Sequence, residues 1–170
     1  MNMRTVLMAA LIAASTISVT PTAVAAAPLT VQSDVASEAA NQAVVESLYR
    51  AFAVNDGATI SGLLAADLIW MEAEGGPLAD RNPYNGPAAV FEGVFGRIGA
   101  QFEGFVVTPV TFMVHGGRVA AMGRYTGTNR ATGEALDAQF VHVFTVTGGK
   151  ITRFQQYTDT AQWMDVVTPD

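Results

Sequence analysis

The chain has 170 residues, of which half are apolar and 14% are charged, and this composition suits a single folded domain with a packed core. The formal net charge of −6 disfavours nucleic acid and anionic membrane surfaces as partners, since both are bound by clustered Lys and Arg. Cysteine is absent, which excludes disulfides, thiolate metal sites and a cysteine nucleophile.

The N-terminal segment has the pattern of a secretory signal peptide. Arg4 supplies a positive charge, residues 5–19 are mostly apolar, and Ala23-Val24-Ala25 provides small residues at the spacing of a cleavage site. The apolar run is too short to span a bilayer comfortably, so no membrane anchor is expected. We therefore predict that residues 1–26 are removed and that the product is periplasmic or secreted.

The rest of the chain is expected to form a flexible leader over 27–40 and one domain over 41–167. The domain begins with a helix, because apolar side chains recur at helical spacing in its first part. This stripe consists of Val44, Val45, Leu48 and Phe52.

The predicted elements that follow alternate between helix, strand and loop. A short second helix over 58–65 precedes a strand over 67–72. A loop rich in Gly, Pro and Asn then covers 74–86, and Pro87 starts a third helix. The apolar stripe of this third helix consists of Val90, Val94 and Ile98.

From residue 104 onward the chain has strand character. Four runs rich in Val, Phe and Thr are separated by turns and are predicted as strands: 105–114, 118–127, 136–147 and 151–159. A final helical turn is expected over 161–166. Helices followed by an antiparallel meander indicate an α+β fold with helices on one face of the sheet. Three helices cannot cover a long curved sheet, so a mostly apolar pocket is expected between the layers.

Six segments carry a resemblance to a known family: 48–52, 63–70, 84–87, 140–144, 149–151 and 154–159. They resemble the SnoaL-like, ketosteroid-isomerase-like proteins of the nuclear transport factor 2-like superfamily. The resemblance implies a cone-shaped α+β barrel, in which a curved, mostly antiparallel sheet wraps around three N-terminal helices and an interior pocket. It also implies a homodimer. Because the superfamily includes isomerases, cyclases, dehydratases, epoxide hydrolases and non-catalytic binding proteins, it leaves the activity open.

The resemblance further implies which strand faces line the pocket, namely those with Trp70, Arg124, His142 and Gln156. Cyclases and epoxide hydrolases of the superfamily use a carboxylate on the last strand, where this chain has Gln156. The epoxide-hydrolase pattern adds an Arg and an Asp on the third strand, where this chain has Arg124 and Thr126. An amide cannot take up a proton near neutral pH, so that mechanism is not supported.

Three side chains are candidates for acid–base catalysis: His142, Asp159 and Glu72. His142 titrates near neutral pH, and its alternative is a core histidine whose ring nitrogens are both satisfied. Asp159 ends the last strand, and its alternative is a cap for the final helical turn. Glu72 would lie at the pocket rim beside Trp70, although an exposed Glu at a strand end is also common.

Six side chains are expected to contact a bound molecule: Trp70, Tyr84, Arg124, Phe140, Phe154 and Gln156. The aromatic ones are core residues by default, but some core residues of a cone are also pocket wall. Arg124 either binds an oxyanion or forms a surface ion pair, and Tyr84 either caps the opening or holds its loop down. Two isolated histidines, His115 and His142, give no metal site.

These observations predict an exported protein that binds a small, largely apolar or aromatic molecule. The expected chemistry is acid–base catalysis of the isomerase, dehydratase or other lyase type, without a cofactor. In this prediction His142 transfers the proton, and Arg124 or Gln156 stabilises developing negative charge. Two alternatives remain: a non-catalytic binding or carrier protein, favoured by the missing carboxylates, and a dimeric interaction module that uses the open sheet face.

Overall fold

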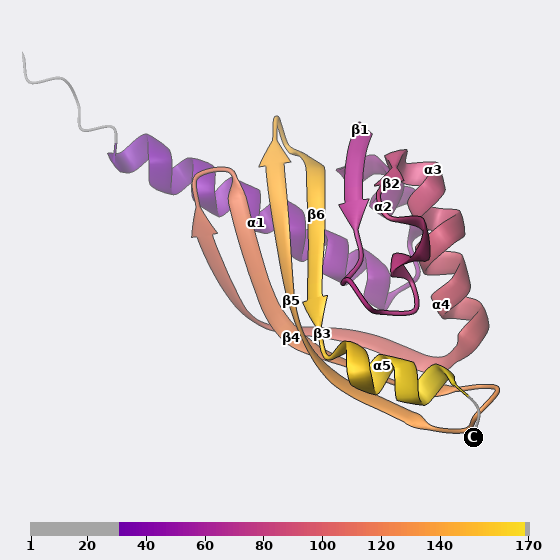
Figure 1. The fold of residues 1–170 in the computed structure, drawn as a ribbon. Coiled ribbons are helices and arrows are strands. Elements are labelled where there is room, and N and C mark those ends of the chain that lie inside the picture. Colours follow the sequence, from indigo (N-terminus) through magenta and orange to yellow (C-terminus); the bar gives the residue numbers. More distant parts are fainter. Residues whose placement is uncertain (1–30, 169–170) are drawn as a thin grey trace, which may run out of the picture.

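The helices lie against one side of a strongly curved sheet (Figure 1). The computed structural model describes residues 31–168, so the predicted signal peptide lies outside the described residues. Helical elements in chain order are α1 (Val31–Ala53), α2 (Gly57–Leu63), η1 (Ala79–Arg81), α3 (Gly86–Val90), η2 (Phe91–Phe95), α4 (Gly96–Gln101) and α5 (Thr160–Val167). None of the helices in this range combines the length and the apolar character that a membrane crossing requires.

Six strands form one mixed sheet, in the order β2-β1-β6-β5-β4-β3. They are β1 (Leu64–Met71), β2 (Tyr84–Asn85), β3 (Phe102–His115), β4 (Arg118–Asn129), β5 (Ala135–Thr147) and β6 (Lys150–Thr158). Strand β1 runs parallel to β6, and all other neighbours are antiparallel. The α+β class and the mostly antiparallel curved sheet predicted from the sequence are confirmed, and the sheet stays open with β2 and β3 as its edges.

Helix α1 begins earlier than the sequence analysis predicts. Residues 31–40, assigned above to a flexible leader, are helical and continuous with the rest of α1. The segment contains three Ala and no Gly or Pro, so nothing in it interrupts a helix. It is also held to the sheet, because Glu38 accepts a hydrogen bond of 2.7 Å from the Gly116 N–H, in the turn between β3 and β4.

The core lies between α1 and the concave face of the sheet. Alternate side chains of β5 are buried on the concave face of the sheet: Leu136, Ala138, Phe140, His142, Phe144 and Val146. Helix α1 meets them with Val45, Leu48 and Tyr49, which are also buried. Burial of two facing apolar surfaces is the main favourable contribution to such a fold. The polar member of the β5 row, His142, therefore lies inside the core.

The predicted third helix is present as α3, η2 and α4, a continuous helical segment with a π-helical turn in its middle. Gly93 in this turn faces the ring of Tyr84, and a side chain there would overlap the ring. Tyr84 belongs to β2, which pairs with Ile69 and Trp70 of β1. A strand of two residues within a loop rich in Gly and Pro has no sequence pattern of its own, and the sequence analysis did not predict it.

Candidate active site

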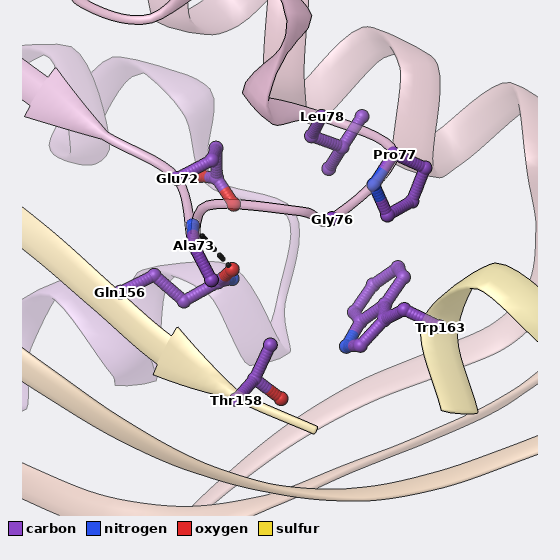
Figure 2. Close-up of a pocket in the computed structure, with 8 residues that line it drawn as sticks. All are labelled: Glu72, Ala73, Gly76, Pro77, Leu78, Gln156, Thr158 and Trp163. Atoms are coloured by element: carbon purple, nitrogen blue, oxygen red, sulfur yellow. Dashed lines mark hydrogen bonds between the residues drawn. The ribbon is translucent and has the colours of Figure 1, made fainter. Parts of the chain in front are cut away.

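A small cavity lies where β1 and β6 end, between the loop after β1 and helix α5. Its lining consists of Glu72, Ala73, Gly76, Pro77, Leu78, Gln156, Thr158 and Trp163 (Figure 2). Glu72 and Gln156 lie on one side, and Trp163 of α5 lies on the other. The volume is about 10 Å³, which is room for about one water molecule. The expected pocket between sheet and helices is thus nearly filled in this conformation.

Glu72 is the buried carboxyl of this cavity. It follows β1 and shares the inward face with Trp70, and only 2% of its surface is exposed. The Trp70 indole N–H donates a hydrogen bond of 2.6 Å to Glu72 Oε1. The side chain of Asn82 fixes the Glu72 backbone, since its Oδ1 accepts from the Glu72 N–H at 2.9 Å and its Nδ2 donates to the Glu72 carbonyl at 2.8 Å. The carboxyl is therefore held in one orientation.

The surroundings of Glu72 make it a weak acid. Burial raises the pKa of its carboxyl from 4.5 to about 7, although the Trp70 N–H and the Gln156 amide favour the charged form. A group with such a pKa is present in both protonation states near neutral pH. It can accept a proton and return it without large changes in free energy.

A hydrogen-bonded chain of buried side chains extends from the cavity to α1. Gln156 accepts a bond of 3.2 Å from the Ala73 N–H, beside Glu72, and its amide donates at 2.9 Å to the Tyr125 hydroxyl. Tyr125 in turn bonds His142 Nε2, and His142 Nδ1 bonds the Tyr49 hydroxyl at 2.8 Å. The neutral imidazole donates from one ring nitrogen and accepts at the other, so one of the two tyrosine hydroxyls donates to His142 and the other accepts from it.

His142 is the centre of this chain and not a free acid or base. Both ring nitrogens are bonded, the residue is 5% exposed, and it does not belong to the cavity lining. Burial lowers the pKa of the imidazole from 6.5 to about 3, so it is neutral at physiological pH. His142 is therefore the second of the two possibilities considered from the sequence, a core histidine whose ring nitrogens are both satisfied.

Three predicted ligand-binding aromatic residues are packed inside the cone, two of them against each other and the third against His142. Trp70 stacks on Phe154 with ring centroids 3.6 Å apart, and Phe140 stacks on the His142 ring at 4.1 Å. Like Gln156, which pairs with His142 across the two strands, they face the concave side of the sheet. Of this group only Gln156 lines the cavity, because the rings fill the remaining space.

Arg124 does not lie on the concave face, and its predicted place in the pocket is wrong. Side chains alternate along β4, and Tyr125 points inward, so Arg124 points outward. Its side chain is 52% exposed and forms an ion pair of 2.7 Å with Asp137 on the neighbouring strand. This arrangement matches the surface ion pair named above as its alternative.

Asp159 and Tyr84 have structural positions at the edges of the site. Asp159 is exposed and caps α5, where its carboxylate accepts a hydrogen bond of 3.1 Å from the Gln162 N–H. Tyr84 is buried, and its hydroxyl donates to the Leu78 carbonyl at 2.6 Å, which ties down the loop after β1. Neither residue lines the cavity.

Four further residues belong to the site or its hydrogen-bonded chain and were not expected there from the sequence: Tyr49, Asn82, Tyr125 and Trp163. The alternation of Val119, Ala121 and Tyr125 along the third predicted strand was a usable signal for the inward position of Tyr125. The spacing of Trp163 and Val166 in the final helical turn indicated one buried face. Residues 31–168 contain no group of three or more His, Cys, Asp or Glu that could hold a metal ion.

Comparison with known proteins identifies the family. A model of the SnoaL-like domain matches residues 45–154. A nuclear transport factor 2-like protein from Burkholderia thailandensis is 31% identical, with a TM-score of 0.71, and the match covers 76% of this chain and 98% of that one.

Two other solved structures share the fold at lower identity. TerC, co-crystallised with polyporic acid, is 23% identical with a TM-score of 0.67, covering 75% of this chain and 97% of its own. A putative SnoaL-like polyketide cyclase from Jannaschia sp. is 17% identical with a TM-score of 0.64, covering 79% and 96%. No curated protein matches the sequence. The domain match and the similarity to the Burkholderia protein confirm the resemblance found in the sequence motifs, and the chain belongs to the SnoaL-like family.

Proposed function

We propose that this protein catalyses a cofactor-free proton transfer on a small, largely apolar molecule, with Glu72 as the general base and acid. The observation that carries the proposal is the position of the Glu72 carboxyl, which is buried beside a cavity and oriented by the Trp70 N–H. A fixed carboxyl at a site that excludes bulk water is the arrangement that general acid–base catalysis requires.

The proposed step conserves atoms and charge within the site. The ionised Glu72 carboxylate takes a proton from a carbon of the substrate, and the electrons of that C–H bond move into the substrate. The neutral carboxyl then returns the proton, either to another carbon in an isomerisation or to a departing hydroxyl in a dehydration. The pKa of about 7 suits both halves of this cycle.

Gln156, Tyr125 and His142 act in this proposal as positioning residues. Their hydrogen bonds hold the Gln156 amide against the Ala73 backbone, next to Glu72. His142 remains neutral throughout and contributes by keeping Tyr125 and Gln156 in place. This role differs from the proton transfer expected from the sequence.

Two relatives support the proposed class of ligand. TerC was co-crystallised with polyporic acid, and the Jannaschia protein is described as a putative SnoaL-like polyketide cyclase. Both have the same fold as this chain. They support a small apolar or aromatic molecule as the ligand and acid–base chemistry as the activity.

The same proposal includes export and dimerisation. The pattern of residues 1–26 supports cleavage near Ala26, which an intact-mass measurement of the protein made in a bacterium would test.

The outer face of the sheet exposes Val110, Met113, Val141 and Tyr157, and burying such side chains would stabilise a homodimer. Sedimentation velocity would test this, and a monomer at micromolar concentration would contradict it.

The activity can be tested before the substrate is known. A base that removes a carbon-bound proton exchanges it with solvent, so deuterium from D₂O should enter a substrate among a panel of small ketones and hydroxy compounds. Mass spectrometry measures the incorporation. Glu72→Gln keeps the size of the side chain, removes the base and should slow exchange about 10²–10⁴-fold.

Glu74→Gln is the matched control, because Glu74 is an exposed carboxylate in the same loop. It should leave the exchange rate unchanged. Exchange that persists in Glu72→Gln would contradict the role of Glu72. Panel members that bind without any exchange would favour a carrier protein over an enzyme.

A further inference from the structure

Trp163 carries a buried hydrogen-bond donor that the protein does not use. The residue is 3% exposed, and within residues 31–168 its Nε1 atom has no hydrogen-bond partner. Buried polar groups are nearly always satisfied by protein, water or a ligand, so an exception calls for an explanation. No other fully buried side-chain nitrogen or oxygen in this range lacks a partner, and both ring nitrogens of His142 are bonded.

The indole is firmly held. It meets the rings of Phe102 and Tyr125 edge to face, with centroids 5.5 Å and 5.4 Å apart. The C-terminal end of α5 is fixed by the Thr132 hydroxyl, which donates to the Val166 carbonyl at 2.8 Å. The unbonded N–H is therefore a feature of a well-packed element.

The N–H lies at the cavity that contains Glu72. Figure 2 shows the indole nitrogen on the edge of the ring that faces Thr158, across the cavity from Glu72 and Gln156. The Thr158 hydroxyl donates to the Gln139 carbonyl at 2.7 Å, and the Gln156 oxygen already accepts from Ala73. The space left beside the indole, about 10 Å³, has the size of one oxygen atom or water molecule.

We propose that the Trp163 indole N–H binds an oxygen atom of the ligand, which makes the ligand a small, largely apolar molecule with an acceptor oxygen. The inference rests on the proposed function only in taking this cavity as the ligand site. The oxygen enters between Trp163 and Glu72, and the apolar body lies where the loop meets α5. A Cβ built on Gly76 would lie 3.5 Å from Thr160 Cγ2, so the loop lies close to α5 there and the two must separate to admit the ligand.

Two probes of similar shape test the donor without any turnover. Acetophenone has an apolar ring and an acceptor oxygen, whereas ethylbenzene has a similar apolar body but no oxygen. The chain has two tryptophans, so its indole N–H groups give two ¹⁵N–¹H resonances, and Trp163→Phe identifies one of them. Acetophenone should move the Trp163 resonance downfield, and ethylbenzene should not.

The Trp163→Phe variant keeps an aromatic ring but lacks the donor. It should bind acetophenone roughly five- to ten-fold more weakly, as expected for one hydrogen bond, and bind ethylbenzene with unchanged affinity. Equal acetophenone affinity in the two proteins, or a Trp163 resonance that does not move up to the solubility limit of acetophenone, would overturn the proposal.

Failure of this proposal and failure of the proposed function are distinguishable. Glu72→Gln should still show the acetophenone-induced shift of the Trp163 resonance, because the measurement reports binding alone. A shift without proton exchange in the wild-type protein would retain Trp163 as the donor and remove Glu72 as the base. Exchange without a shift would retain Glu72 as the base and remove Trp163 as the donor.

Discussion

The buried carboxyl of Glu72 lies at the mouth of the cone and the buried imidazole of His142 in its interior, and the surroundings of these two groups differ. Glu72 at the mouth borders a cavity and has a pKa of about 7. His142 in the interior has both nitrogens bonded to tyrosines and a pKa of about 3. Burial disfavours the charged form of both groups. It prepares Glu72 for proton transfer but removes His142 from it, so access to a cavity separates the two roles.

The largest expected effect concerns His142 and acid stability. Its folded-state pKa of about 3 lies below the 6.5 of the unfolded chain. Between these two pH values the imidazole is protonated in the unfolded state and neutral in the folded state. The free energy of unfolding should fall as the pH drops from 6.5 toward 3, by on the order of 5 kcal/mol. Urea denaturation at a series of pH values measures this.

The acid limb of the stability curve is the decrease in the free energy of unfolding as the pH falls. The variant His142→Gln should flatten this limb, since an amide does not titrate. His115→Gln is the control, because His115 is fully exposed at the end of β3 and the variant should keep the acid limb of the wild type. An acid limb as steep in His142→Gln as in the wild type would remove the contrast between the two regions.

Glu72 should produce a pH dependence of the opposite sign. Its folded-state pKa of about 7 lies above the 4.5 of the unfolded chain, so the folded state keeps a proton that the unfolded state releases. Its contribution is complete below pH 4.5 and is lost as the pH rises through 7, by roughly 3 kcal/mol. Glu72→Gln should abolish this loss. A free energy of unfolding that rises between pH 5 and 7.5 in the His142→Gln variant, which retains Glu72, would contradict it.

Asp159 also lies near the mouth, but it is exposed and caps a helix. Asp159→Ala should lower the free energy of unfolding by about 1 kcal/mol, and Asp159→Asn should restore most of it, because Asn is an equally good cap. Turnover should change little in either variant. A large loss of turnover in Asp159→Asn with unchanged stability would move catalysis from Glu72 to Asp159.

Arg124 should have the smallest effect. Its ion pair with Asp137 is exposed to solvent, and such pairs contribute little. Arg124→Gln should leave both the urea midpoint and ligand affinity within experimental error. Weaker acetophenone binding in this variant would show that the outer face of β4 takes part in the site.

Strand alternation and family motifs predicted much of this architecture from the sequence. Gln156 and His142 were expected on one face, and they pair across β5 and β6. Arg124 was misplaced because the family register was given more weight than the apolar alternation that includes Tyr125. The satisfaction of His142 was not predictable from local pattern, because its partner Tyr49 is 93 residues away in the chain.

Both tryptophans of the chain flank Glu72, one bonded to its carboxyl and the other across the cavity. Indole fluorescence depends on nearby charge, so the emission of the two tryptophans should report the protonation state of the Glu72 carboxyl. The fluorescence of the unliganded protein should follow a single titration near pH 7. In Trp70→Phe the remaining signal comes from Trp163, and it would show whether the charge is felt on the far side of the cavity.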